Sequence, residues 1–413
     1  MTLKELSRGV AAALLAAGLG VSAHAADAIR LGFLTINSGA LAAGGKQMEE
    51  GLRLFLKERN NMIAGRKVEL IVADTAGQPA VTKSKAQELV EKDKVHVIIG
   101  PLAAFEALAI DDYIRKSETP IISPSAAAED LTQRKPNPWF VRAVGTSAQA
   151  NHAMGEYAAK DLKYKRVAVI ADDFAFGHET VSGFQRVFEE NGGKVVQKLW
   201  SPLNVADYGT YISQIKPDVD AVFAGFAGGN GIKFLKQYKE YGLQGKIPVL
   251  ASMTTVDEGI LKSMGDEALG VVSAGWYTAT LNNPNNKKFA AEMNRDYKHD
   301  PGYYSVGAYG AALMLEQALK DVKGKIEDKP AFMAALRKVQ LTNDPRGKLS
   351  LDALGQPVMD IYIRKVAKVN GKLVNSVVKT YPAVSQFWTY KQSDFLAAPV
   401  YSRDYPQAKN LEK

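Results

Sequence analysis

The sequence predicts an α/β fold of two similar lobes, each built on a parallel sheet, with several crossings of the chain between them. Short β-branched runs alternate with amphipathic stretches at helical spacing, which is typical of βαβ units. This alternation occurs once before Phe140 and again after Val167. The 413 residues are also enough for two domains, each with a core of its own.

The N-terminus indicates export. Lys4 and Arg8 precede an apolar stretch, Val10 to Val21, and Ala23-His24-Ala25 forms a small-x-small cleavage site. The stretch is shorter than the ~20 residues that cross a bilayer. We therefore expect residues 1–25 to be a cleaved signal peptide, with an uncleaved anchor as the alternative.

The first lobe follows as a βαβαβ series. Its predicted helices end near Arg59 and cover Lys83 to Lys92. Its predicted strands are Ile29 to Leu34, Val68 to Ala73, Val97 to Ile99 and Ile121 to Ile122. Such a series requires a parallel sheet covered on both faces.

Two loops of this lobe, after Ile99 and after Ile122, consist of small residues and are each expected to open a helix. Helix N-termini carry unpaired N–H groups and partial positive charge, so two of them in one cleft would bind an anion such as a carboxylate. Gly100-Pro101 and Ser123-Pro124 are otherwise ordinary turns. The N–H groups in question belong to Ala103, Ala104, Phe105, Ser125, Ala126 and Ala127.

The second lobe repeats the pattern, and the chain then returns. Predicted helices cover Glu179 to Asn191, Tyr208 to Ile215 and Ile232 to Tyr241, and predicted strands include Val167 to Ala171, Val195-Val196, Ala221 to Ala224 and Val249 to Ala251. Val271 to Tyr277 leads back to a long helix, Pro301 to Leu319, which needs the first sheet to pack on. Asp360 to Val369 and Leu373 to Val378 alternate as a hairpin around Asn370-Gly371.

Composition excludes several function classes. The chain has no cysteine, hence no disulfide, thiol chemistry or Cys-bound metal. Its net charge of +8 comes from scattered basic residues, so we expect no nucleic acid partner.

Three short motifs lack the residues or the spacing that a metal site, a catalytic site or a dinucleotide loop requires. His178-Glu179 lacks a third metal ligand. Asp172-Asp173 lacks the partner base or nucleophile that general acid/base work needs. Gly225 to Gly231 lacks the G-x-G-x-x-G spacing of a dinucleotide loop. We expect no metal, no cofactor and no catalytic residue.

In order and spacing, a set of motifs resembles the type I periplasmic binding proteins of ABC importers, in the branch that includes the leucine/isoleucine/valine-binding protein. The motifs are Leu34-Thr35 to Ala42-Ala43, Ile99 to Leu102, Ile122 to Ala126 with Leu131-Thr132, Phe140 to Arg142, Asp173 to Gly177, Ala224 to Phe226 and Gly347 to Asp352.

This resemblance implies two Rossmann-like lobes joined by a multi-crossing hinge. The N-terminal lobe would comprise residues 26–145 and 278–355, and the C-terminal lobe residues 146–277 and 356–413. The resemblance also implies a monomeric periplasmic protein that delivers a ligand to ABC permease subunits in the inner membrane. Arg142 matches a position that usually holds structure between segments. A ligand sensor and an exported enzyme remain the other classes, and the enzyme lacks a recognisable nucleophile and base.

The resemblance also bears on the ligand. Amino-acid binders of this family hold the ligand carboxylate with hydroxyls at the positions of Ala104 and Ala127, so only backbone donors remain here. Their acidic partner for the ammonium matches Thr254, and no carboxylate follows until Asp257. A desolvated ammonium without a counter-charge costs several kcal/mol, most of the about 8 kcal/mol of micromolar binding. A branched-chain or other hydrophobic amino acid is therefore the second choice.

Aromatic residues complete the expected site. Phe105, Phe176 and Phe226 match cleft positions of the family, and Trp276 lies at the predicted crossing, while Asn37 follows the first strand. Aromatic walls suit a flat ring. We expect an aromatic acid such as a benzoate or a cinnamate or coumarate derivative. The alternative for each ring is packing between the lobes.

Overall fold

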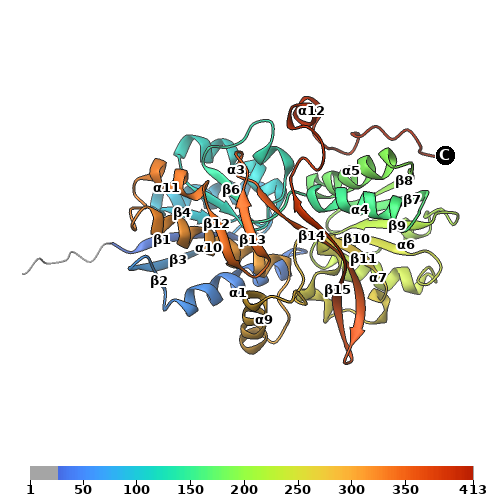
Figure 1. The fold of residues 1–413 in the computed structure, drawn as a ribbon, viewed down its shortest axis with the longest axis horizontal. Coiled ribbons are helices and arrows are strands. Elements are labelled where there is room, and N and C mark those ends of the chain that lie inside the picture. Colours follow the sequence, from blue (N-terminus) through green and yellow to red (C-terminus); the bar gives the residue numbers. More distant parts are fainter. Residues whose placement is uncertain (1–26, 413) are drawn as a thin grey trace, which may run out of the picture.

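The computed structural model describes residues 27–412, which form two α/β lobes lying side by side (Figure 1). The predicted signal peptide, residues 1–25, lies outside the described residues. Among the helices between residues 27 and 412, none is both long and apolar enough to cross a membrane.

The N-lobe is built on a six-stranded sheet with the strand order β2-β3-β1-β4-β5-β6. All neighbours pair in parallel except the β2–β3 hairpin, which the sequence did not predict. The parallel strands predicted for this lobe are confirmed. The strands are β1 (Ile29–Thr35), β2 (Met62–Ile63), β3 (Arg66–Asp74), β4 (Val97–Ile99), β5 (Ile121–Ser123) and β6 (Phe140–Arg142).

Helices cover both faces of this sheet. They are α1 (Ala42–Glu58), α2 (Pro79–Gln87) with a π-helical turn (Glu88–Lys92), α3 (Ala104–Ser117), α10 (Tyr303–Asp321) and α11 (Lys329–Leu336). α10 packs against α1, β4 and β5, which confirms that the long returning helix uses the first sheet. α9 (Pro284–Tyr297) packs against α1.

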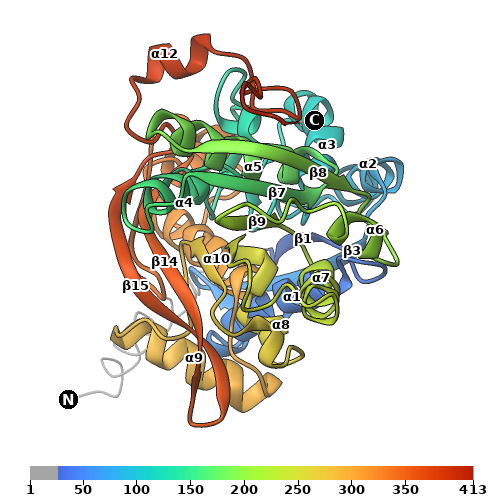
Figure 2. The ribbon, with the colours of Figure 1, turned by 90° about the vertical axis from the view of Figure 1, so that its right-hand side faces the viewer.

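The C-lobe repeats the arrangement with five parallel strands in the order β11-β10-β9-β7-β8. Along β7, Val167 and Val169 face the core shared with α5 (Ala175–Glu190), whereas Ala168 and Ile170 face the core shared with α7 (Asn230–Glu240). Figure 2 shows these helices on opposite sides of the sheet. The strands are β7 (Arg166–Asp172), β8 (Lys194–Ser201), β9 (Ala221–Gly225), β10 (Val249–Ser252) and β11 (Val272–Gly275).

The helices of this half are α4 (Gln149–Lys160), α5 (Ala175–Glu190), α6 (Gly209–Ile212), α7 (Asn230–Glu240), α8 (Glu258–Leu261) and α12 (Gln392–Ala397). Two 3-10 turns, η3 (Met253–Val256) and η4 (Asp266–Ala268), flank α8. The helix predicted over Tyr208 to Ile215 is only the single turn α6, and the sequence did not predict α4, α8, α9, α11 or α12.

Antiparallel strands extend the second sheet from β11 toward the N-lobe. They are β12 (Gln340–Asp344), β13 (Gly347–Leu351), β14 (Pro357–Val369) and β15 (Lys372–Val384). The β14–β15 hairpin confirms the hairpin predicted around Asn370-Gly371. Its two strands extend further from the turn than the predicted ones. Asn370 and Gly371 have φ values of 49° and 78°, as a two-residue type I′ turn requires.

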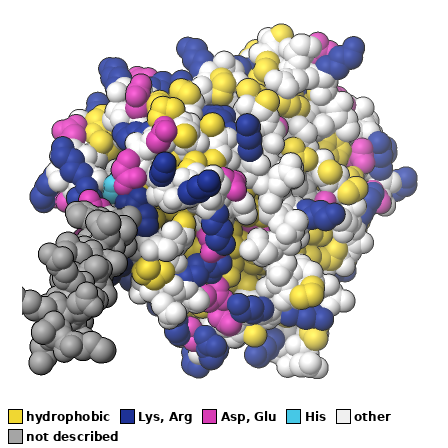
Figure 3. Space-filling view, turned by 60° about the vertical axis from the view of Figure 1, so that its left-hand side comes forward, with side chains coloured by type: hydrophobic (Ala, Val, Ile, Leu, Met, Phe, Trp, Pro, Cys, Tyr) yellow, Lys and Arg dark blue, Asp and Glu magenta, His cyan; other side chains and the backbone are white. Residues whose placement is uncertain are grey.

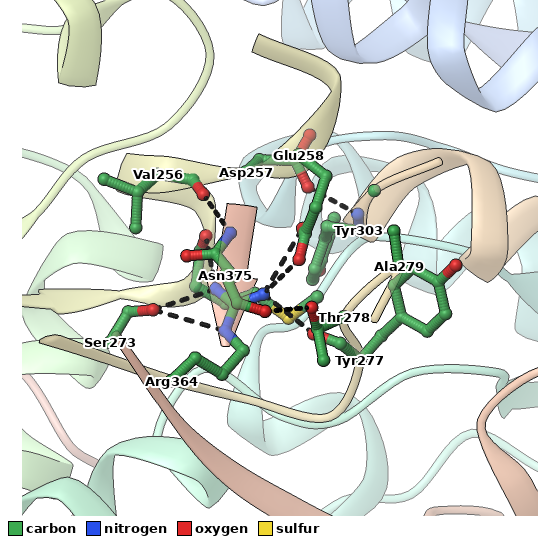
Figure 4. Close-up of polar contacts among 12 residues, drawn as sticks. Val256, Asp257, Glu258, Ser273, Tyr277, Thr278, Ala279, Tyr303, Arg364 and Asn375 are labelled. Carbon is green, nitrogen blue, oxygen red and sulfur yellow. Dashed lines mark hydrogen bonds and ion pairs between the residues drawn. The ribbon is translucent and has the colours of Figure 1, made fainter. Parts of the chain in front are cut away.

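A buried polar network around Arg364 of β14 holds the segment that leads from β11 back to the N-lobe (Figure 4). The guanidinium donates to Glu258 Oε1 at 3.1 Å, to the Tyr277 carbonyl at 2.7 Å and to Ser273 Oγ at 3.0 Å. On the N-lobe side, the N–H of Tyr303 donates to Asp257 Oδ1 at 2.5 Å. The network therefore joins the sheet, the crossing and the start of α10.

On one face of the molecule, charged side chains are spread out rather than gathered into one patch. On the face in Figure 3, Lys and Arg lie at many separate points with Asp and Glu among them. This face therefore offers no continuous basic stripe of the kind that nucleic acid binding uses.

Candidate ligand-binding site

A cavity of about 30 Å³, which we call the main cavity, lies between the lobes. Its N-lobe walls are Leu41, Leu102, Ala103, Ala104, Ser125, Ala127, Tyr303 and Tyr304, and its C-lobe walls are Phe174, Phe176, Ala227 and Thr254. Because both lobes supply walls, a molecule in this cavity touches both and is enclosed when they close.

A second space of about 10 Å³, which we call the side cavity, shares Phe176, Thr254 and Tyr303 with the main cavity, so the two abut. Its remaining walls are Ser147, Ala150, Asn151, Ser252, Met253, Ala274 and Trp276.

A larger groove of about 360 Å³ lies elsewhere, between α8, the end of α9 and the tip of the β14–β15 hairpin. Half of its lining residues are charged, and they include the exposed ion pair between Lys368 and Asp266. The groove lacks the largely apolar lining that small-molecule sites use.

The start of α3 supplies hydrogen-bond donors to the main cavity. Gly100 in the preceding loop has φ +139°, and a Cβ there would lie 2.5 Å from the Leu34 carbonyl oxygen, so the turn requires glycine. Glu106 Oε2 accepts from the Ala103 N–H at 2.8 Å. The N–H groups of Ala104 and Phe105, in the first turn, have no partner within the helix. Of the three donors expected here, the Ala103 N–H is thus already paired, and of the other two residues Ala104 lines the main cavity whereas Phe105 does not.

The second loop differs from the prediction, because no α-helix follows β5. Residues 124–128 are irregular and lead into the 3-10 turn η2 (Glu129–Thr132). Arg142 is fully buried, and its guanidinium donates hydrogen bonds to the carbonyl oxygens of Ala126 and Ala128. The Ser147 hydroxyl donates to the carbonyl oxygen of Ala127. These bonds hold the segment out of a helix. Arg142 has the structural role that the resemblance implied.

Of the predicted site residues, Ala103, Ala104, Ser125, Ala127, Phe176 and Thr254 line the main cavity, and Trp276 lines the side cavity. The Thr254 hydroxyl donates to the Phe226 carbonyl at 2.7 Å.

Four predicted residues lie outside both cavities. Phe226 is in the C-lobe core, with its ring centroid 5.1 Å from Tyr208 and 4.9 Å from Phe234, and it lines neither cavity. Phe105 packs on Phe174 at 5.5 Å and so joins the lobes. Ala126 is buried and Asn37 is exposed.

The sequence reasoning missed several wall residues. Phe174 lies two residues before Phe176, within the motif Asp173 to Gly177, so its position in the sequence is a signal for it. Tyr303 and Tyr304 begin α10 directly after Pro301-Gly302, a helix start at a crossing of the chain. The hydroxyl of Tyr303 donates to the Ser125 carbonyl at 2.6 Å. Asn151 had no signal, because it lies inside a helix that the pattern did not reveal.

No Asp, Glu, Lys or Arg is among the residues that line either cavity. The nearest acidic residues of the sequence motifs are used elsewhere. Asp172 accepts from the Ala227 N–H at 2.9 Å and from the Asn230 amide at 2.8 Å, and burial raises its pKa to about 7. Asp257 caps α10 through the Tyr303 N–H. The walls therefore present apolar surface and neutral donors and acceptors.

Two buried carboxyl groups, those of Glu129 and Glu179, meet where the lobes join. Glu179 Oε1 of α5 accepts from the Glu129 N–H at 3.2 Å, and Glu129 Oε1 accepts from the Ala148 N–H at 2.8 Å. Burial raises the pKa of Glu179 well above its usual range, and the charge of Glu129 raises it further. Glu179 therefore keeps its proton to a higher pH in the folded protein than in the unfolded chain.

We expect this proton to make stability fall with rising pH. The contribution of Glu179 is complete below its unfolded pKa, about 4.5, and is lost as the pH rises toward the folded value, by at most about 1.4 kcal/mol per pH unit. Glu179→Gln should therefore gain stability relative to the wild type between pH 5 and pH 7, measured by urea unfolding. The exposed control, Glu240→Gln, should track the wild type. Parallel curves for all three proteins would contradict this assignment.

Two lobes that enclose a shared cavity, with no charged group in its walls, define a solute-binding protein. The periplasmic binding protein family model matches residues 28–372, and the chain belongs to this family. It is a periplasmic substrate-binding component of an ABC transporter and not an enzyme. The predicted family and fold are thereby confirmed.

Three relatives illustrate the range of the family. The Leu/Ile/Val-binding protein homolog 6 of Brucella melitensis is 28% identical over 89% of this chain and 95% of its own. A solute-binding protein of Rhodopseudomonas palustris BisB5, solved with 3,4-dihydroxybenzoic acid, is 34% identical, with a TM-score of 0.84 over 87% of this chain and 99% of its own. Another from R. palustris, solved with benzoate, is 27% identical, with a TM-score of 0.82 over 87% and 98%.

Proposed function

We propose that this protein captures a small aromatic carboxylate, such as a benzoate or a cinnamate or coumarate derivative, and presents it to ABC permease subunits. The observation that carries the proposal is the character of the main cavity. Its walls combine aromatic rings with the N-terminus of α3 and include no acidic side chain.

The carboxylate belongs at the start of α3. The N–H groups of Ala104 and Phe105 are free of intrahelical partners, and the helix end adds partial positive charge. Ser125 and Ala127 also line the cavity. The carbonyl oxygens of their segment already accept hydrogen bonds from Tyr303, Arg142 and Ser147. Donors rather than acceptors therefore remain on that side.

The ring belongs among four aromatic side chains. Phe174 and Phe176 belong to the C-lobe, whereas Tyr303 and Tyr304 begin α10 in the N-lobe. Phe174 and Phe176 are already 5.9 Å apart, and Tyr303 and Tyr304 are 4.7 Å apart, between ring centroids. A flat ligand between these pairs gains offset and edge contacts with both lobes, which favours the closed form.

The second candidate is a branched-chain or other hydrophobic amino acid, which the name of the Brucella relative supports. Its ammonium would meet only the Thr254 hydroxyl, the backbone and the tyrosines. Leaving that charge without a counter-ion costs several kcal/mol. The R. palustris proteins solved with benzoates, one of them 34% identical, favour the aromatic acid.

In the proposed cycle the protein is a monomer whose lobes, residues 26–145 with 278–355 and residues 146–277 with 356–413, part to admit the ligand and close over it. The site comprises Ala103, Ala104, Ser125, Ala127, Phe176, Thr254 and Trp276 from the prediction, together with Phe174, Tyr303 and Tyr304. The Phe226 ring, the Asn37 side chain and the Ala126 side chain are not part of it. A sensor would use the same cleft, and genes for two permeases and two ATPases beside this one would favour transport.

A thermal-shift series tests the ligand class. Benzoate and 4-coumarate at 100 times their dissociation constant should stabilise the protein by about 2.7 kcal/mol, because they bind only the folded form. Leucine and valine at millimolar concentration should give no shift. Stabilisation by leucine without any by the aromatic acids would overturn the proposal in favour of the amino acid.

A further inference from the structure

We infer that the side cavity is a hydroxyl-recognition subsite and that the preferred ligand is a ring-hydroxylated aromatic acid, with its hydroxyl at the end remote from the carboxylate. This inference rests on the proposed function, because it extends the same ligand from the main cavity into the side cavity.

Two polar atoms that belong to side chains lining the side cavity lack partners among the described residues. The Nε1–H of Trp276 has no acceptor and Oδ1 of Asn151 has no donor among residues 27–412. Asn151 has an exposed fraction of only 4%, and so does Trp276. Buried polar groups are nearly always hydrogen-bonded, and leaving them unpaired destabilises the protein. Their common position makes a bound partner the simplest explanation.

The orientation of the Asn151 amide is fixed by its other end. Nδ2 donates to the Ser147 carbonyl at 2.7 Å, within the first turn of α4. A flipped amide would place two acceptors against each other there. The unpaired atom is therefore the oxygen, a hydrogen-bond acceptor.

The indole of Trp276 is fixed by packing. A Cβ at Gly145 would lie 2.6 Å from Cε3 and Cζ3, so the six-membered ring rests directly on the Gly145 backbone. The Tyr303 ring lies 5.1 Å away between centroids. Nε1 is on the opposite edge of the indole from Cε3 and Cζ3. The Nε1–H is consequently a rigid donor rather than one that turns away to solvent.

A donor and an acceptor in one small space select for a hydroxyl group. A hydroxyl accepts from Trp276 and donates to Asn151 at the same time. A carboxylate only accepts and would face Asn151 Oδ1, whereas an ammonium only donates and would leave Trp276 unpaired. A volume of about 10 Å³ also suits a single oxygen atom.

The position of the subsite sets the position of the hydroxyl. The side cavity begins where Phe176, Thr254 and Tyr303 end the main cavity, while the start of α3 lines only the main cavity. A ring whose carboxylate binds at Ala104 thus directs a distal substituent toward Trp276. This geometry favours a 4-hydroxyl group over a 2-hydroxyl group.

Calorimetry with wild-type protein and three ligands tests the inference. We expect 4-hydroxybenzoate to bind at least tenfold more tightly than benzoate, and 4-methylbenzoate, which has the same shape but cannot hydrogen-bond, to bind no better than benzoate. Equal affinities for all three would mean that the subsite holds only a water molecule, and would overturn the inference while leaving the proposed function intact. Failure of all three to bind would instead overturn the proposed function.

Variants locate the effect. Trp276→Phe and Asn151→Leu should each reduce the ratio of the 4-hydroxybenzoate affinity to the benzoate affinity by about tenfold, because only the hydroxyl loses a hydrogen-bond partner. Trp139→Phe, at a half-buried tryptophan outside both cavities, is the matched control. A hydroxyl preference that survives in both variants would contradict the assignment of the subsite. The wild-type series decides the question even if a variant fails to fold.

Discussion

Replacing Ala104 by aspartate should weaken benzoate binding at least 100-fold, or about 2.7 kcal/mol. Ala104 is the first residue of α3 and lines the main cavity. The new carboxylate would compete for the free N–H groups of the first turn and repel the ligand carboxylate. Aspartate is favoured in the first turn of a helix, so we expect the protein to remain folded. Isothermal calorimetry measures the loss.

Two controls separate charge from bulk. Benzamide has the shape of benzoate without its charge, so Ala104→Asp should weaken benzamide much less than benzoate. Leu108→Asp adds the same charge to α3 at a residue that is 45% exposed, and should leave both affinities unchanged. Equal losses of benzoate and benzamide in Ala104→Asp would show that the ligand carboxylate does not bind at this helix end.

Replacing Arg364 by methionine should lower the free energy of unfolding by about 3 kcal/mol or more. The Arg364 side chain is fully buried and donates to Glu258, Tyr277 and Ser273 (Figure 4). Its loss leaves the Glu258 carboxyl and a backbone carbonyl unpaired in the interior, and breaking a buried ion pair from one side typically costs about 3–5 kcal/mol. Urea unfolding measures the change.

Lys368→Met is the matched control, on the same strand. Lys368 and Asp266 form an ion pair at 3.0 Å with side chains 50% and 58% exposed, and such pairs contribute about 1 kcal/mol or less. In the double variant Arg364→Met/Glu258→Leu, part of the lost stability should return, because no buried charge is left alone. Equal effects of Arg364→Met and Lys368→Met would contradict the stabilising role of the network.

Much of the fold could be predicted because the sequence carries local signals for it. Parallel strands buried on both faces, such as Val97–Ile99, appear as uninterrupted β-branched runs. The turn at Asn370-Gly371 needs two positive φ values, which few other residue pairs supply. Helix α4 was not predicted because its sequence has no clear apolar stripe. Its buried face includes the polar residues Gln149, Asn151 and His152.

The site was harder to predict because long-range contacts, which local sequence patterns do not reveal, determine the conformation of its segments. Residues 125–128 are rich in alanine and look helical, but Arg142 and Ser147 bind their carbonyls from elsewhere in the chain. Phe226 follows a strand end that faces the cleft, yet the hydroxyls of Thr254 and Thr255 hold its backbone and its ring turns into the core. The absence of an acidic residue near Thr254, in contrast, could be deduced from the sequence itself.

The crystal structure of the protein grown with 4-hydroxybenzoate tests the central claim most directly. We predict carboxylate oxygens within about 3 Å of the Ala104 and Phe105 nitrogens. The ring should lie between the phenylalanines of one lobe and the tyrosines of the other, and the hydroxyl should reach Trp276 and Asn151. A carboxylate turned away from α3, or a ligand bound outside the main cavity, would contradict this account.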